Sequence, residues 1–184
     1  MVLLHIQLEN LKHLKKKDAV GDTIPEATFT YIAYTPELEA KLACGIPTKL
    51  NTNSWKGKKI VLFSVPGAFT PTCHANHLPP YIEKYDEFKA KGVDAIAVVA
   101  ANDAFVLSGW GRFEGVQDKL LMLSDTDAKW SESMGLSVDL SAVGFGTRTA
   151  RYAMIIDDLV VKYVELEPAK GVTVSGADAV LSKL

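Results

Sequence analysis

Cys73 stands in a stretch of sequence whose residue types and spacing suit thiol chemistry. The segment VPGAFTPTCHANHLP, residues 65–79, follows an apolar run and places a glycine, two prolines and two threonines ahead of this cysteine. Thr70 is a good helix N-cap and Pro71 suits the first helical position, so the spacing predicts Cys73 in the first turn of a helix. Free N–H groups and the helix dipole favour an anion there, which suits a thiolate.

A thiolate by itself would supply only part of an enzyme's rate. A free thiol has a pKa near 8.5 and is about 3% ionised at pH 7. Complete ionisation raises the reactive fraction about 30-fold at most, which is about 2 kcal/mol. The first-turn N–H groups, the Thr70 hydroxyl and a nearby arginine could meet the charge that develops in the transition state. The alternative is a buried structural cysteine, which packs as a small hydrophobe and needs neither the turn nor the cap.

Strand and helix patterns on both sides of this segment predict the elements that would position it. The apolar run IVLFSV, residues 60–65, is typical of a central strand that is covered on both faces. The same reasoning predicts strands over 27–34, 94–100 and 119–125, a hairpin over 151–166 that turns at Asp157 and Asp158, and helices over 81–92, 103–113, 127–135 and 175–184.

The order of these elements predicts an α/β fold. Strands that alternate with helices need parallel crossovers, and the late hairpin adds antiparallel strands. A mixed central sheet with helices on both faces is the thioredoxin-like arrangement. Such sheets place their chemistry at the carboxyl end of a central strand, where the chain turns into a helix. The segment 65–79 is predicted to lie at that point.

Length and composition indicate an ordinary globular protein of one domain. The chain has 184 residues, of which 48% are hydrophobic and 23% charged. A net charge of −2 gives no reason to expect nucleic-acid binding, and no apolar run approaches the ~20 residues that span a bilayer. Two cysteines without a CxxC pair predict neither a disulfide framework nor structural zinc, and they favour a reducing compartment.

The two ends of the chain carry separate hypotheses. Residues 1–17 are interpreted as an N-terminal extension of unknown role, with a mitochondrial leader as the alternative, and residues 18–184 as the single domain. The chain ends in Ser182, Lys183 and Leu184, and a C-terminal S-K-L is an address read by the peroxisomal import receptor. We therefore expect a peroxisomal location, with a cytoplasmic pool as a further possibility. The alternative is the ordinary end of a final helix.

The segment VPGAFTPTC resembles the active-site loop of peroxiredoxins, whose pattern is P-x-x-x-[TS]-x-x-C. The wider resemblance is to the type-five subfamily, which includes fungal peroxisomal members and alkyl hydroperoxide reductases. It runs in order from about residue 18 to the end, through GKKIVLFSVPGAFTPTC, HLPPYIEK, KAKGVDAIAVV, NDAFV, WGR, LSD and RYAMIIDD. The resemblance implies a homodimeric thiol peroxidase that reduces hydrogen peroxide and alkyl hydroperoxides without haem, flavin or metal. Thioredoxin, glutathione or glutaredoxin would be the reductant.

The resemblance also implies roles for four residues. Cys73 matches the peroxidatic cysteine, which attacks the peroxide O–O bond and becomes a sulfenic acid. Thr70 matches the hydroxyl that orients the peroxide, and Pro66 matches the proline that shields the site from water. Arg151 matches the arginine that binds the peroxide oxygens. From the residues alone Arg148 would serve as well, and only the match to RYAMII selects Arg151.

Reduction of the sulfenic acid is where the sequence departs from part of the family. Some type-five members carry a resolving cysteine near the C-terminus, but GVTVSGADAV contains none. Cys44, in the turn-like segment AKLACGIP, is the candidate resolving cysteine, because some fungal relatives resolve there between subunits. The alternative is that Cys44 is a bystander and an external thiol reduces Cys73.

Two further residues near the motif have open interpretations. His77 follows Cys73 by one helical turn, which would allow a Cys–His pair or half of a metal site, but a packing histidine is the favoured interpretation. Arg112 lies near the end of the helix predicted over 103–113 and could face the pocket or a subunit interface.

Two other functions would use the same residues or the same fold. A peroxide sensor or redox relay would pass the oxidation of Cys73 to a partner protein, and turnover with a reductant separates it from a peroxidase. A thioredoxin-type oxidoreductase is disfavoured, because His74 to Asn76 follow Cys73 without a second cysteine of a CxxC pair.

Overall fold

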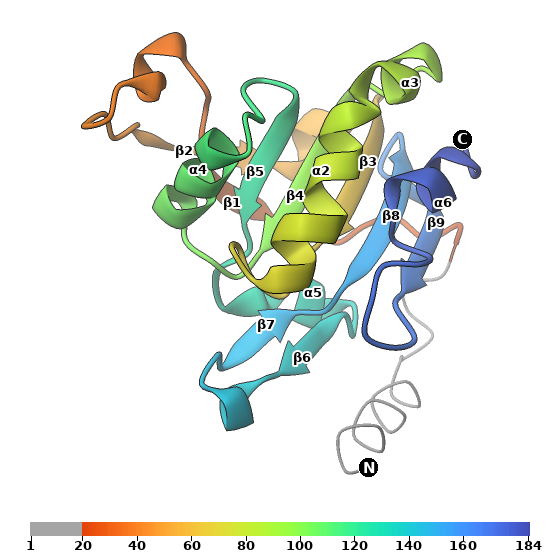
Figure 1. Cartoon of the computed structure of the whole chain (residues 1–184). Coiled ribbons are helices and arrows are strands. Elements are labelled where there is room, and N and C mark those ends of the chain that lie inside the picture. Colours follow the sequence, from red (N-terminus) through yellow and green to blue (C-terminus); the bar gives the residue numbers. More distant parts are fainter. Residues whose placement is uncertain (1–19) are drawn as a thin grey trace.

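A computed structural model describes residues 20–184 and shows a seven-stranded sheet with helices on both faces (Figure 1). The strand order is β2-β1-β5-β4-β3-β8-β9, in which β3, β4 and β5 are parallel and the other pairs antiparallel. This confirms the predicted α/β fold with a mixed central sheet. The extension 1–17 lies outside the described residues.

The bounds of the elements agree with most of the predicted ones. The strands of the main sheet are β1 Thr28–Ile32, β2 Pro47–Asn51, β3 Lys59–Ser64, β4 Ala95–Ala100, β5 Leu120–Ser124, β8 Tyr152–Asp157 and β9 Val160–Leu166, and a separate pair is β6 Ser137–Asp139 with β7 Thr147–Thr149. The helices are η1 Pro36–Glu39, η2 Thr52–Trp55, η3 Cys73–His77, α2 Leu78–Glu83, α3 Tyr85–Ala90, α4 Ala104–Phe113, η4 Thr126–Ala128, α5 Lys129–Ser133, η5 Ser141–Val143 and α6 Ala177–Leu181.

Side chains of each central strand alternate between two cores, as the pleat of a strand requires. One core packs the sheet against α2, α3, α4 and α6, and its strand residues include Val61, Phe63, Ile96 and Val98. The other core packs the opposite face against α5 and Trp55, and its strand residues include Ile60, Leu62, Ala97 and Val99. Continuous burial of β3 and β4 therefore explains their uninterrupted apolar sequence.

Three local features differ from the sequence prediction. The helix predicted over 81–92 is two helices, because Lys84 leaves helical geometry between α2 and α3 (φ −95°, ψ 15°). The hairpin turns one residue later than predicted, at Asp158 and Leu159, which both have positive φ, as a two-residue turn of the primed type requires. Strands β2, β6 and β7 were not predicted; β2 opens with a proline, which an edge strand tolerates.

The cysteine segment occupies the place predicted for it. Strand β3 ends at Ser64, the chain crosses the end of the sheet, and the helix that begins at Pro71 runs back over the face that carries α2 (Figure 1). No helix among residues 20–184 is both long and apolar enough to cross a membrane.

Candidate active site

Cys73 lies at the start of a helix whose first turns are wider than an α-helix. The Thr70 carbonyl accepts the first helical hydrogen bond, from His74 N–H at 2.9 Å, which places Thr70 at the N-cap. The next segment, η3, is a π-helix in which Leu78 N–H bonds to the Cys73 carbonyl. Single π-turns inside helices are frequent at functional sites. The Cys73 side chain is fully buried, at 0% exposure.

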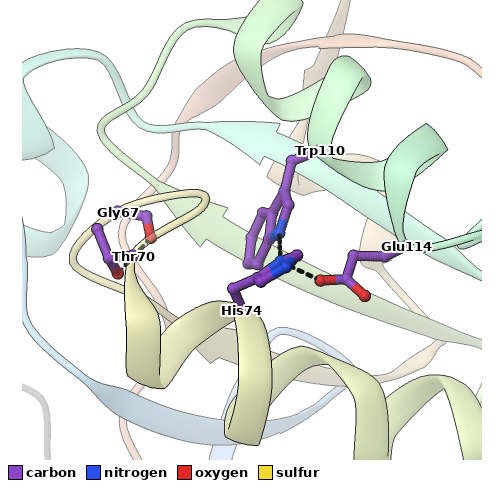
Figure 2. Close-up of polar contacts among 5 residues, drawn as sticks. All are labelled: Gly67, Thr70, His74, Trp110 and Glu114. Atoms are coloured by element: carbon purple, nitrogen blue, oxygen red, sulfur yellow. Dashed lines mark hydrogen bonds and ion pairs between the residues drawn. The ribbon is translucent and has the colours of Figure 1, made fainter.

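The loop between β3 and this helix is held by hydrogen bonds from inside and outside. The Thr70 hydroxyl donates to the Gly67 carbonyl at 2.8 Å (Figure 2), so its oxygen lone pairs remain able to accept. Asn102 Oδ1 accepts from Ala68 N–H at 2.9 Å. Thr149 Oγ1 donates to the Val65 carbonyl at 2.8 Å. The loop therefore has one defined shape around the thiol.

Arg151 reaches Cys73 because of the strand register. Strand β8 pairs antiparallel with β3 and places Tyr152 opposite Ser64, the last residue of β3. Arg151, one position earlier, therefore lies beside the start of the loop. Its Nη2 donates to Cys73 Sγ at 3.2 Å. A guanidinium at this distance stabilises negative charge on sulfur.

Arg148, the other arginine considered, points elsewhere. Its Nη1 donates to the Pro66 carbonyl at 3.3 Å, and its Nε donates to the Phe145 carbonyl at 2.8 Å. Arg148 therefore supports the backbone of the loop, while Arg151 contacts the sulfur. Pro66 itself is partly buried at the end of β3.

His77 is buried, as expected of a packing residue, but it also contacts Arg151, which the sequence did not predict. The ring is fully buried, with Nε2 2.9 Å from the Ser175 carbonyl and Nδ1 3.0 Å from Arg151 Nη1. Burial, aided by the charge of Arg151 and opposed by the hydrogen bond to Ser175, lowers the pKa of His77 to about 4. His77 is therefore neutral near pH 7. The one-turn spacing after Cys73 was visible in the sequence, but the partner on β8 was not.

A second polar cluster on the exposed side of the site also escaped prediction. His74 Nδ1 contacts Glu114 Oε1 and lies 3.1 Å from Trp110 Nε1 (Figure 2). An indole N–H only donates and a carboxylate only accepts, so Nδ1 can satisfy one of them at a time. Phe69 and Phe113 border His74, with ring centroids 5.9 and 5.4 Å away. This rim ties the cysteine helix to the end of α4.

Cys44 lies in very different surroundings. It is exposed, between η1 and β2, and this segment projects from the edge of the sheet (orange in Figure 1). Three strands separate β2 from β3, which is a lateral distance of roughly 19 Å. A disulfide needs Cα atoms within about 7 Å. The structure therefore does not bring Cys44 and Cys73 of one chain together.

Arg112, the remaining candidate, serves the Cys44 segment. Its Nη1 donates to the Ala43 carbonyl at 3.0 Å and its Nη2 to the Ala40 carbonyl at 3.1 Å. Among residues 20–184, neither of these hydrogen bonds of Arg112 is to the Cys73 loop. The same part of the chain contains no group of three or more histidine, cysteine and acidic residues able to hold a metal ion.

Comparisons with known proteins agree with this arrangement. Residues 19–181 match the family described as Redoxin. A Lipomyces kononenkoae protein named "Putative peroxisomal peroxiredoxin" is 51% identical over 166 residues, which are 89% of this chain and 99% of that protein. "Peroxiredoxin Pen c 3" of Penicillium citrinum is 45% identical over 168 residues, 89% of this chain and 97% of that one.

Solved structures give the same result. Reduced Prx3 of Vibrio vulnificus in complex with H2O2 superposes with a TM-score of 0.78 at 44% identity, over 89% of this chain and 97% of that chain. Peroxiredoxin 5 of Alvinella pompejana superposes with a TM-score of 0.73 at 33% identity, over 90% of this chain and 96% of that chain. The chain belongs to the peroxiredoxin family, resembles its type-five members, and is a thiol-dependent peroxidase.

Proposed function

We propose that Cys73 is the peroxidatic cysteine and that it reduces hydrogen peroxide and small alkyl hydroperoxides. The observation that carries this proposal is the contact between Arg151 Nη2 and the buried Cys73 Sγ, 3.2 Å long, at the start of a helix. The thiolate attacks one peroxide oxygen, the S–O bond forms and the O–O bond breaks. The leaving oxygen takes up a proton as water or an alcohol, and Cys73 becomes a sulfenic acid.

Three neighbours have supporting roles in this proposal. Arg151 stabilises the thiolate and the negative charge that develops on the peroxide oxygens. The Thr70 hydroxyl accepts a hydrogen bond from the peroxide while it donates to Gly67. Pro66 excludes water from the sulfur. The site then needs neither a metal nor an organic cofactor.

The test measures the rate at which hydrogen peroxide or tert-butyl hydroperoxide oxidises the reduced protein in a single turnover. Tryptophan fluorescence monitors the reaction. Thr70→Val keeps the size of the side chain but removes the hydroxyl, and we expect it to slow oxidation about 100-fold. Thr72→Val is the matched control, because it makes the same change two residues later in the same segment. It should keep the wild-type rate. Equal rates for both variants would contradict the role of Thr70.

Resolution by Cys44 of a partner subunit is the second step that we propose. The Cys44 thiol would attack the sulfenic sulfur, so that an S–S bond forms and water leaves. Exposure of Cys44 and the strands that separate it from Cys73 within one chain favour a bond between two chains of a homodimer. After one equivalent of hydrogen peroxide, a non-reducing gel should show a covalent dimer that Cys44→Ser and Cys73→Ser both abolish.

The alternative outcome of that gel is a one-cysteine mechanism, in which an external thiol reduces the sulfenic acid directly. Thioredoxin, glutathione and glutaredoxin are the candidate reductants in either case. Multiple turnovers with one of them identify a peroxidase in action. A peroxide sensor or relay would instead be oxidised once and stay oxidised until its partner protein is added.

For location we propose import into peroxisomes through Ser182, Lys183 and Leu184. A relative at 51% identity carries the word peroxisomal in its name. Ser182 and Lys183 are exposed, whereas Leu184 packs partly against the core beneath α6, so a receptor would need to draw the last residue away. A fluorescent protein fused ahead of the full chain should reach peroxisomes, and removal of the last three residues should leave it in the cytoplasm.

A further inference from the structure

The loop between β9 and α6 leads to the same arginine that contacts Cys73. We propose that Glu167 and Ser175 are positioning residues, which hold the Arg151 guanidinium against Cys73 through His77. This inference rests on the role of Arg151 proposed above. Neither residue touches Cys73, and neither was singled out by the sequence.

The Glu167 carboxylate is the centre of this loop. The residue is 5% exposed, and its carboxylate accepts four hydrogen bonds. Oε1 accepts from Thr173 N–H at 2.6 Å, Ser175 N–H at 2.8 Å and Ser175 Oγ at 2.7 Å, and Oε2 accepts from Thr173 Oγ1 at 2.6 Å. Burial raises the pKa of Glu167, but these hydrogen bonds outweigh it and hold the pKa below its usual range. The loop is therefore closed around an ionised carboxylate.

The Ser175 carbonyl, which this loop holds in place, lies next to His77. It accepts from Tyr81 Oη at 2.7 Å and lies 2.9 Å from His77 Nε2. A carbonyl can only accept, so Nε2 carries the proton of the neutral ring. Nδ1 is then a lone pair, which accepts from Arg151 Nη1 at 3.0 Å. The Ser175 carbonyl thus fixes the tautomer of His77. That tautomer in turn leaves Nδ1 free to accept the hydrogen bond from Arg151 Nη1.

A backbone hydrogen bond also links Glu167 to Arg151. Glu167 N–H donates to the Arg151 carbonyl at 2.9 Å, so Arg151 is linked to Glu167 through its main chain and through its side chain. Glu165, two positions earlier on β9, is exposed instead. It carries the same charge near the end of β9, just before the loop that contains Glu167, and provides a matched control.

The experiment compares Glu167→Gln with Glu165→Gln in the full chain. A glutamine amide offers two N–H donors where the loop supplies only donors, so the carbonyl of Ser175 loses its fixed place. We expect Glu167→Gln to slow oxidation of Cys73 by hydrogen peroxide about ten-fold, because small displacements of a positioned group have effects of this order. Glu165→Gln should keep the wild-type rate.

The tautomer of His77 is a second measurement, and a change in it would not result from a general loss of protein stability. Nitrogen NMR of the labelled histidine rings, assigned with His77→Gln, should show a neutral His77 with its proton on Nε2. Glu167→Gln should give a mixture of the two tautomers. In an Arg151→Ala background, Glu167→Gln should slow the reaction no further, because both changes remove the same contact.

The outcomes separate this inference from the proposed function. If Arg151→Ala reacts at the wild-type rate, the role of Arg151 is wrong and the inference falls with it. If Arg151→Ala is slow but folded Glu167→Gln keeps the wild-type rate and tautomer, only the positioning role is overturned. If Glu167→Gln does not fold, Ser175→Ala decides, because it removes one hydroxyl donor. Slower oxidation supports the role, and the wild-type rate overturns it.

Discussion

The surroundings of Cys73 and Cys44 differ in what holds each residue in place. Cys73 is buried, and its sulfur is contacted by a guanidinium that is itself held by a buried histidine. The loop around this thiol is held by side-chain hydrogen bonds from Asn102, Arg148 and Thr149, which come from other parts of the chain. A sulfur in such a place has its charge and its access controlled by the fold.

The Cys44 segment is held by its backbone instead. Arg112 binds two of its carbonyls, while Leu42 and Ile46 on either side of Cys44 are 92% and 86% exposed. This anchoring fixes where the segment lies without enclosing the thiol. The comparison shows that the fold encloses one thiol among fixed polar groups and leaves the other open to solvent.

Loss of the guanidinium at the Cys73 site should have the largest effect. We expect Arg151→Ala to slow oxidation of Cys73 by hydrogen peroxide about 100-fold, because one charge-stabilising donor is worth about 3 kcal/mol in a transition state. Stopped-flow fluorescence measures this rate. Arg148→Ala is the comparison, since it loses contacts to the Pro66 and Phe145 carbonyls and to Asn102 but none to the sulfur. An equal loss for both arginines would show that the loop backbone, not the contact with sulfur, sets the rate.

Acid should destabilise the Cys73 region through His77. The pKa of this buried residue is lowered from 6.5 to about 4, so below pH 6.5 the unfolded chain binds a proton that the folded chain does not. The free energy of unfolding should therefore fall as the pH falls from 6.5 to 4, by about 3 kcal/mol from this residue.

Urea unfolding at a series of pH values measures this slope. Other groups titrate in the same range, so the difference between wild type and His77→Gln isolates the histidine. The slope should be smaller in the variant between pH 4 and 6.5. Parallel curves over that range would contradict the assignment of a neutral His77.

At the Cys44 segment, crowding at Gly45 should affect stability and leave the peroxide reaction alone. A Cβ at this position would lie 2.2 Å from Ile32 Cγ2 and 3.2 Å from Leu38 Cδ2. We expect Gly45→Ala to lower the free energy of unfolding by about 2 kcal/mol, measured with urea. Gly109→Ala, where nothing lies within 4 Å, is the matched control and should not destabilise the protein. If Gly45→Ala also slows peroxide oxidation, the two regions are not independent.

The smallest effect is expected from Arg112. Its replacement by alanine removes two partly exposed hydrogen bonds to backbone carbonyls, each worth about 1 kcal/mol. We expect disulfide formation to slow several-fold on non-reducing gels, with the rate of peroxide oxidation unchanged. Lys41→Ala removes a positive charge from the same segment and should do neither. Disulfide formation at the wild-type rate in Arg112→Ala would show that this anchor is dispensable.

The sequence was most informative where local pattern decides the structure. The apolar run before the motif, the N-cap Thr70 and the proline after it predicted the strand, the turn and the place of Cys73. These features depend on neighbours in sequence, and the structure has them within a residue or two.

Partners that meet through the sheet register were beyond the same reasoning. The contact between Arg151 and Cys73 depends on which residue of β8 faces Ser64, and the order imposed on His77 comes from a loop near the chain end. A single glutamate after β9 carries no local signal that it closes a loop. The π-turn at Cys73 was likewise hidden, since its sequence reads as an ordinary helix.

The most direct test identifies which cysteine becomes a sulfenic acid. Reduced Cys44→Ser is mixed with one equivalent of hydrogen peroxide and a reagent that traps sulfenic acids, and the modified peptide is identified by mass spectrometry. The account predicts modification at Cys73, and no reaction on this time scale in Cys73→Ser. Oxidation of Cys73→Ser as fast as that of the wild type would contradict the claim that the enclosed thiol performs the chemistry.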